Sequence, residues 1–143
     1  MKDPSGLIRT WLYGVLNTKV SYGGSVVPVY SFVPKNAAMP YILLAGQTGS
    51  SELEESTKDT YITRHSITVE IYASGTGNRA SYVPVNNISD SVAQLVRTRN
   101  KITMSGYNII SIVFDNSLTD AFISETNTIT LKVLNFTLTI EES

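Results

Sequence analysis

The chain contains no cysteine, which excludes disulfide bonds and cysteine-ligated metal sites. Charge is also scarce, since 16% of the 143 residues are charged and the net charge is −1. Because binding to phosphates requires clustered Lys and Arg, this balance argues against nucleic-acid binding as the main task. No apolar run approaches the roughly 20 residues that a membrane span requires. The first residues do not form a signal-peptide pattern, so we expect synthesis and assembly in the cytoplasm and no membrane partner.

What the chain has in quantity is apolar residues, at 42%, together with many Ser, Thr and Asn residues. A length of 143 residues suits one domain, and we predict a single domain over 1–143. Neutral polar surfaces are easier to desolvate against a partner protein than a surface of Lys and Glu. The composition therefore favours a β-rich protein that acts through assembly.

Two segments have the apolar spacing of amphipathic helices. The first covers 4–18, with Asp3 as a plausible N-cap and Pro4 as the first helical residue. The second covers 86–98, with an asparagine at its start as the N-cap. Residues spaced by three and four supply the two buried stripes: Leu7, Ile8, Trp11, Leu12, Val15 and Leu16 in the first, and Ile88, Val92, Leu95 and Val96 in the second.

Alternating apolar and polar residues predict the strands, and the clearest is 61–74. Gly23-Gly24 predicts a hairpin between 19–22 and 25–32, and Pro28 indicates an edge strand or a bulge in the second run. A short apolar strand is expected over 41–46.

Two further strands, 107–114 and 127–140, end the chain, with a polar turn at Asp115, Asn116, Ser117 and Asp120 between them. The apolar residues of 127–140 change parity, which indicates a bulge near Val133-Leu134. The predicted fold class is α+β, a mostly antiparallel four- to six-stranded sheet with two helices packed on one face.

No segment has the pattern of an active site. His65 is the only histidine, and no neighbouring pattern supplies a carboxylate and a nucleophile, so we assign it a structural or surface role. The sequence 75–80 matches G-x-G-x-x-A, but Pro84 and Val85 separate it from the helix that would hold a pyrophosphate. The acidic residues at 115–120 lack the glycine and glutamate of a calcium loop. We predict a protein without catalytic residues, metal or cofactor.

Candidate interaction residues come from two segments. The acidic segment 47–60 reads as a long mobile loop, either simply solvated or acting as an arm that orders against a basic partner. The polar face of the strand 61–74 is the second candidate. The candidates are Glu52, Glu54, Glu55 and Asp59 from the first segment and Arg64, Thr68 and Glu70 from the second. A basic cluster, Arg97, Arg99 and Lys101, is explained by the helix dipole, with weak contact to a DNA backbone as the alternative.

The segment Val33–Ile42 follows the predicted hairpin and carries Pro34, Ala37, Ala38, Pro40, Tyr41 and Ile42. This segment and the order of elements resemble the tail-terminator, or tail-completion, family of tailed bacteriophages. The resemblance implies a homo-oligomeric ring, typically hexameric, at the head-proximal end of the tail in the virion. It further implies that the ring ends tail-tube polymerisation, contacts the tail tube protein and the head–neck connector proteins, and lets DNA pass through its lumen without sequence-specific binding. No catalytic residues are implied.

Two alternatives stay open at this point. Another head–tail connector ring, an adaptor or a stopper, would have the same composition and size. A small hydrolase or ligand-binding domain would instead require a concave pocket with converging polar groups.

Overall fold

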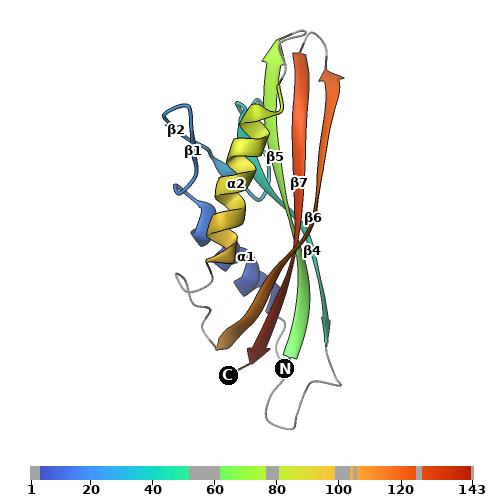
Figure 1. Ribbon diagram of the computed structural model, residues 1–143. Helices are drawn as coiled ribbons and strands as arrows, with labels where there is room; N and C mark the ends of the chain where they lie inside the picture. The colour runs from blue at the N-terminus through green and yellow to red at the C-terminus, as the bar shows by residue number, and fades with distance from the viewer. Residues whose placement is uncertain are drawn as a thin grey trace.

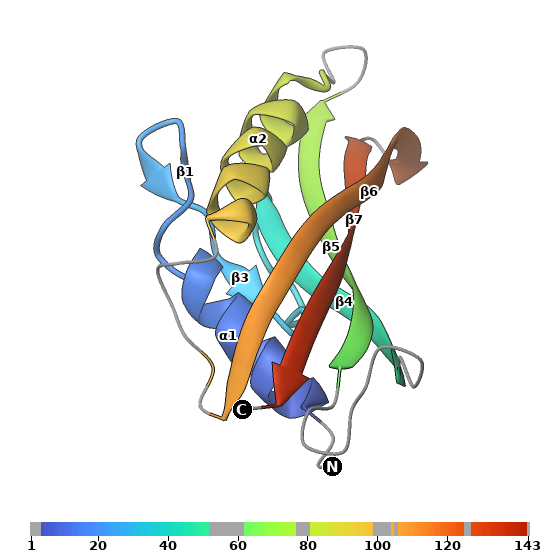
Figure 2. The same ribbon diagram turned by 60° about the horizontal axis from the view of Figure 1, so that its bottom comes forward.

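The computed structural model describes residues 4–51, 62–76, 81–98, 104, 106–124 and 127–142. The elements in chain order are α1 (Ser5–Leu16), β1 (Ser21–Tyr22), β2 (Ser25–Val26), β3 (Val29–Tyr30), β4 (Tyr41–Ser51), β5 (Ile62–Thr76), α2 (Val83–Arg97), β6 (Tyr107–Ser124) and β7 (Asn127–Glu142). Strands β1 and β2 form a small hairpin, and the others form a five-stranded sheet in the order β3-β4-β5-β7-β6. All pairs of that sheet are antiparallel except β3–β4, and both helices lie on one face (Figures 1 and 2). The predicted α+β class is confirmed.

The core fills the space between the two helices and the sheet. Alternate residues of β5 and β7 point toward the helices, so that Ile67 lies level with Phe136 and Val69 level with Leu134. Trp11 of α1 is 3% exposed and belongs to the same cluster. The opposite face of the sheet has no helix on it, and we call it the helix-free face (Figure 2).

Both helices begin at other residues than the sequence predicted. Pro4 is the N-cap of α1, whose first helical residue is Ser5, and Asp3 lies outside the described residues. Helix α2 begins at Val83 with Tyr82 as the N-cap, so the predicted asparagine cap is wrong. The physical reason is Pro84, which suits the first turn because its missing N–H has no partner there in any helix.

The predicted Gly-Gly hairpin is confirmed. Gly23 and Gly24 have φ values of 62° and 82°, and both are in the left-handed region that a tight hairpin turn requires. Pro28 separates β2 from β3, and β3 pairs at the edge of the sheet with the start of β4. The expectation of an edge strand at Pro28 therefore holds.

Strand β4 is longer than predicted. Instead of ending at Gly46, it continues to Ser51, and Gln47–Ser51 pair with Thr63–Ile67 of β5. Only the part of the predicted acidic loop after Ser51 lies outside the described residues. Small polar residues such as Thr48 have little intrinsic strand pattern, and here pairing with a long neighbouring strand decides the conformation.

The largest correction concerns β6, which runs without a turn to Ser124. Asp115, Asn116, Ser117 and Asp120, predicted to form a turn, lie in the middle of this strand. The predicted bulge in the last strand is also wrong, because β7 pairs with β5 without any shift of register. The bulges lie in β6, between Ile109 and Ser111 and between Phe114 and Asn116. The parity change in β7 arises because Ile129, Leu131 and Val133 lie on the helix-free face, where they are half-buried.

Candidate functional site

The helix-free face brings together three of the predicted interaction residues. Arg64, Thr68 and Glu70 alternate along β5 on this face, and Arg64 is exposed. The other four, Glu52, Glu54, Glu55 and Asp59, lie outside the described residues. The predicted polar face of this strand is thus confirmed as a surface that no helix covers.

A polar band crosses the middle of this face. The Thr68 Oγ1 donates a hydrogen bond to Asn135 Oδ1 at 2.8 Å, and Asn135 Nδ2 donates to Asn116 Oδ1 at 2.7 Å. Thr137 Oγ1 donates to a carboxylate oxygen of Asp115 at 2.5 Å. These bonds link β5, β7 and β6, so the band is satisfied within the chain and fixes the side chains of the face.

A tyrosine cluster lies on the same face beside the band. Tyr41 stacks on Tyr72 with ring centroids 5.2 Å apart, and the edge of Tyr30 meets Tyr41 at 5.9 Å. The Tyr72 hydroxyl donates a hydrogen bond to Glu70 Oε1 at 3.1 Å. Burial, followed by the nearby Glu70 carboxylate, raises the pKa of Tyr72 to about 12 and also raises the pKa of Tyr41. The phenols of Tyr41 and Tyr72 are therefore neutral at physiological pH.

Apolar side chains occupy the end of this face near the β6–β7 connection. Leu118 is 57% exposed and Phe122 is 46% exposed, and they lie level with Val133 and Ile129 of β7. Sequence reasoning missed this surface. The signal was present in the odd-numbered apolar residues of β7, which were attributed to a bulge.

Strand β6 forms one edge of the sheet and carries no Lys, Arg, Pro or Gly. Natural edge strands are protected from pairing by charged residues, by proline, by brevity or by bulges, and β6 has two bulges and the carboxylates of Asp115 and Asp120. Six of its large apolar side chains are exposed: Ile110, Val113, Phe114, Leu118, Phe122 and Ile123, the last at 79%. An edge strand with so many exposed apolar side chains is typical of a surface for another protein.

The opposite edge is formed by β3 and, beyond it, by β4. The pairing of β3 covers only Ile42 and Leu43 of β4. Arg9 of α1 then donates to the carbonyl oxygens of Leu44 and Ala45, at 2.5 and 3.0 Å, at the point where the pairing of β4 with β5 is irregular. In the part of the chain that the structure describes, no strand pairs with the outer side of Gln47–Ser51.

His65 has a structural environment. It is 3% exposed, and its Nε2 lies 2.9 Å from Thr63 Oγ1. Gly49 lies opposite it on β4, and a Cβ at that position would be 2.6 Å from His65 Nδ1. The glycine therefore leaves the room that the imidazole ring occupies.

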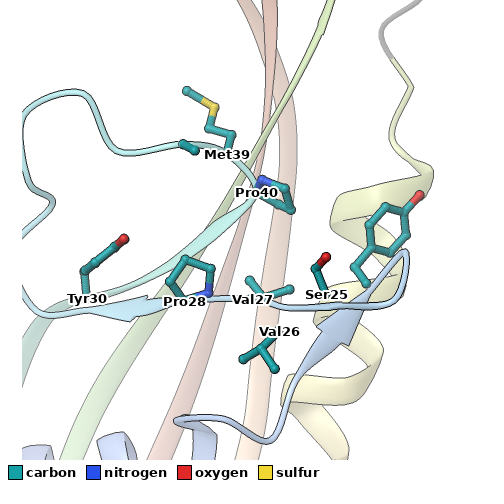
Figure 3. Close-up of a pocket in the computed structure, with 9 residues that line it drawn as sticks. Ser25, Val26, Val27, Pro28, Tyr30, Met39 and Pro40 are labelled. Atoms are coloured by element: carbon teal, nitrogen blue, oxygen red, sulfur yellow. The ribbon is translucent and has the colours of Figure 1, made fainter.

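A cavity of about 360 Å³ lies beside β3 (Figure 3). Pro28 and Tyr30 line it from one segment, and Met39 and Pro40 line it from the segment that leads into β4 (Figure 3). Its lining contains no His, Asp, Glu or Lys, and its polar side chains are hydroxyls. The cavity can accept an apolar group and offers no acid, base or metal ligand. Among the described residues, no cluster of His, Asp and Glu that could hold a metal ion is found.

No helix in the described ranges has the length and apolar character that crossing a membrane requires.

Comparison with known proteins gives a likeness in fold. The sequence matches no protein-family model and no curated protein. A chain of the solved structure described as "Virion of native gene transfer agent (GTA) particle" has the same fold. The alignment covers 99% of this chain and 99% of that chain, with a TM-score of 0.74 at 12% sequence identity. At this identity, the likeness shows that the two chains share a fold over their whole lengths.

Proposed function

We propose that the protein is a structural, non-enzymatic component of a phage-like virion. The observation that carries the proposal is the end-to-end likeness to a chain of a gene transfer agent virion particle, at a TM-score of 0.74. The exposed apolar edge and the satisfied polar face suit a protein that works through contacts with other proteins.

Within the virion, we propose the role of a tail terminator. Copies of the chain would form a ring, typically of six, that caps the head-proximal end of the tail tube and joins the tail to the neck. The support is the resemblance of Val33–Ile42 and of the element order to that family. A ring requires two different surfaces that meet between neighbouring copies. The sheet has two different edges that suit this purpose.

The DNA is proposed to pass through the lumen without specific contacts. The net charge of −1 and the low content of basic residues fit a surface that does not hold phosphates. The predicted arm, Glu52, Glu54, Glu55 and Asp59, and the face with Arg64, Thr68 and Glu70 remain proposed contact sites for the tube or the neck.

The test is electron microscopy of the purified protein, alone and mixed with tail tubes and with neck particles from its own virus. Rings, or density that caps one end of each tube, are the expected result. Binding to neck particles without binding to tube ends would replace the terminator role with that of an adaptor or stopper. A protein that ignores both would overturn the virion role and direct attention to the cavity beside β3.

A further inference from the structure

We propose that neighbouring copies of this chain join their sheets edge to edge, the β6 edge of one copy pairing antiparallel with the outer edge of β4 in the next. In the same contact, the exposed apolar side chain of Ile123 would seat against the cavity beside β3 of the neighbour. The register of this pairing rests on the proposed ring, whereas the choice of the two edges rests on the sheet itself.

The two edges have the direction that this pairing requires. Strand β4 is antiparallel to β5, β5 to β7 and β7 to β6, so β6 runs opposite to β4. A neighbouring sheet placed in the same orientation therefore adds its β4 to β6 in the antiparallel sense. Main-chain hydrogen bonds then continue across the contact, as in other cases of strand addition.

The residue types of the two edges also fit. Strand β4 has no charged residue, and beyond Ala45 the edge consists of Gly, Gln, Thr and Ser. These uncharged side chains, most of them small, allow the bulky apolar residues of β6 to approach closely. A two-fold pairing of β6 with itself would instead bring Asp115 and Asp120 of both copies into one strand pair, and like charges across strands are destabilising.

Ring symmetry sets the register. Rotation about the ring axis does not shift a subunit along that axis. If the strands run nearly parallel to the axis, residues at the same level in neighbouring copies therefore lie opposite each other. The pairings Thr48–Ser66, Ser66–Thr137 and Thr137–Val113 place Thr48 and Val113 at one level. The segment Ser111–Phe114 would thus lie against Gln47–Ser50 of the next copy.

The same register places the apolar end of β6 at the height of the cavity beside β3. Tyr41 lies level with Tyr72, Leu131 and Asp120 across the sheet. Because β6 runs opposite to β4, residues after Asp120 lie at the level of residues before Tyr41. Phe122 and Ile123, two and three residues after Asp120, thus lie near the level of Met39 and Pro40.

Ile123, the most exposed apolar residue of β6, therefore reaches the height of the uncharged cavity on the opposite edge, whose lining includes Val26, Pro28 and Met39. The bulge between Phe114 and Asn116 lies where β6 must bend to pass β3 of the neighbour.

Disulfide trapping tests the contact, and the absence of natural cysteine leaves no background. The double variant Thr48→Cys/Val113→Cys places both thiols on the helix-free face. Within one chain, three strand spacings, about 14 Å, separate these positions, too far for a disulfide. Under oxidation, on a non-reducing gel, we expect a ladder of covalent species larger than a dimer. A mixture of the two single variants should give dimers and nothing larger.

The variant Ile123→Glu in the double-cysteine background should reduce the ladder at least tenfold. Gln94→Glu, which adds the same charge on the exposed side of α2, should leave it unchanged. Covalent dimers from Val113→Cys alone would indicate two-fold pairing and overturn the proposal. So would a double variant that stays monomeric both in solution and on tube ends. Tube capping without a ladder refutes the edge contact alone, whereas a ladder without tube capping refutes the terminator role alone.

Discussion

Gly49 provides a sharp test of how the sheet accommodates its buried histidine. A Cβ added at this position would lie 2.6 Å from His65 Nδ1 and 2.8 Å from His65 Cε1, whereas ordinary contact begins near 3.4 Å. The ring is buried, lies within hydrogen-bond distance of Thr63 and belongs to a strand paired on both sides, so it has little freedom to move. Gly49→Ala should therefore strain the region where β4 meets β5.

The expected magnitude follows from two opposing effects. Overpacking a filled site costs about 1–3 kcal/mol. Replacing Gly by Ala within a strand returns roughly 0.5–1 kcal/mol, because Gly loses more conformational freedom on folding. The net loss of unfolding free energy is about 0–2.5 kcal/mol, with a central value of about 1 kcal/mol. For a chain of this size, a loss of about 1 kcal/mol lowers the melting temperature by about 3–4 °C.

Urea denaturation and thermal melts of four variants measure this effect. Gly46→Ala is the matched control, because no atom lies within 4 Å of the added Cβ, and it should be neutral or slightly stabilising. In the background of His65→Ala, which removes the ring, Gly49→Ala should lose its cost and give a coupling of about 1–3 kcal/mol in the double-mutant cycle. Equal tolerance of Gly49→Ala and Gly46→Ala would refute the packing described for His65.

Three further predictions concern the core, the helix anchor and alkaline pH. Trp11→Ala should lower the unfolding free energy by about 3–5 kcal/mol, and Leu7→Ala, which truncates an exposed side chain of the same helix, by under 1 kcal/mol. Arg9→Ala should cost about 1–3 kcal/mol in urea denaturation, because two carbonyl groups of β4 lose a charged donor; a loss as small as that of Leu7→Ala would contradict this anchor. Folding raises the pKa of Tyr72 from 10.0 to about 12. The contribution of the protonated phenol to the unfolding free energy is therefore complete below pH 10 and is lost as the pH rises toward 12. Between pH 8 and 11, the unfolding free energy measured by urea denaturation should fall less steeply with pH in Tyr72→Phe than in the wild type. Identical slopes for the two proteins would refute the raised pKa.

The elements that the sequence predicted well are those that pack against the core. Period-two alternation in β5 placed His65 and Ile67 on one face and Arg64 and Thr68 on the other, and the structure agrees. The helical spacing of α1 was equally informative for most of its stripe, which faces a single core. Leu7, predicted to belong to that buried stripe, is 43% exposed, because it lies at the margin of the stripe in the first turn of the helix. Such patterns are readable when one face is buried and the other meets solvent.

The edges of the sheet were the part that sequence could not supply. Asp115 and Asp120 have the composition of a turn, yet they lie within a strand that is held by pairing with β7. Their neighbours Leu118 and Phe122 have no alternation to read, because most of this part of β6 is exposed on both faces. The candidate assembly surface was therefore missed for a physical reason. Alternation can be read only in a strand with one buried face, and within a single copy this part of β6 has none.

This property of β6 bears on which strands can pair with the edge. A long edge without Lys or Pro is a template for unwanted strand pairing, and its exposed apolar residues add to the risk. Two bulges twist the strand and interrupt the regular row of backbone groups, which penalises a flat partner of arbitrary sequence. A partner strand must match the bend of β6 as well as its hydrogen bonds. Strand β4 has an irregularity of its own between Leu44 and Gln47, and it lies at the same level as the bulge between Phe114 and Asn116. The two irregularities at one level favour a specific pairing between copies over pairing with any free strand.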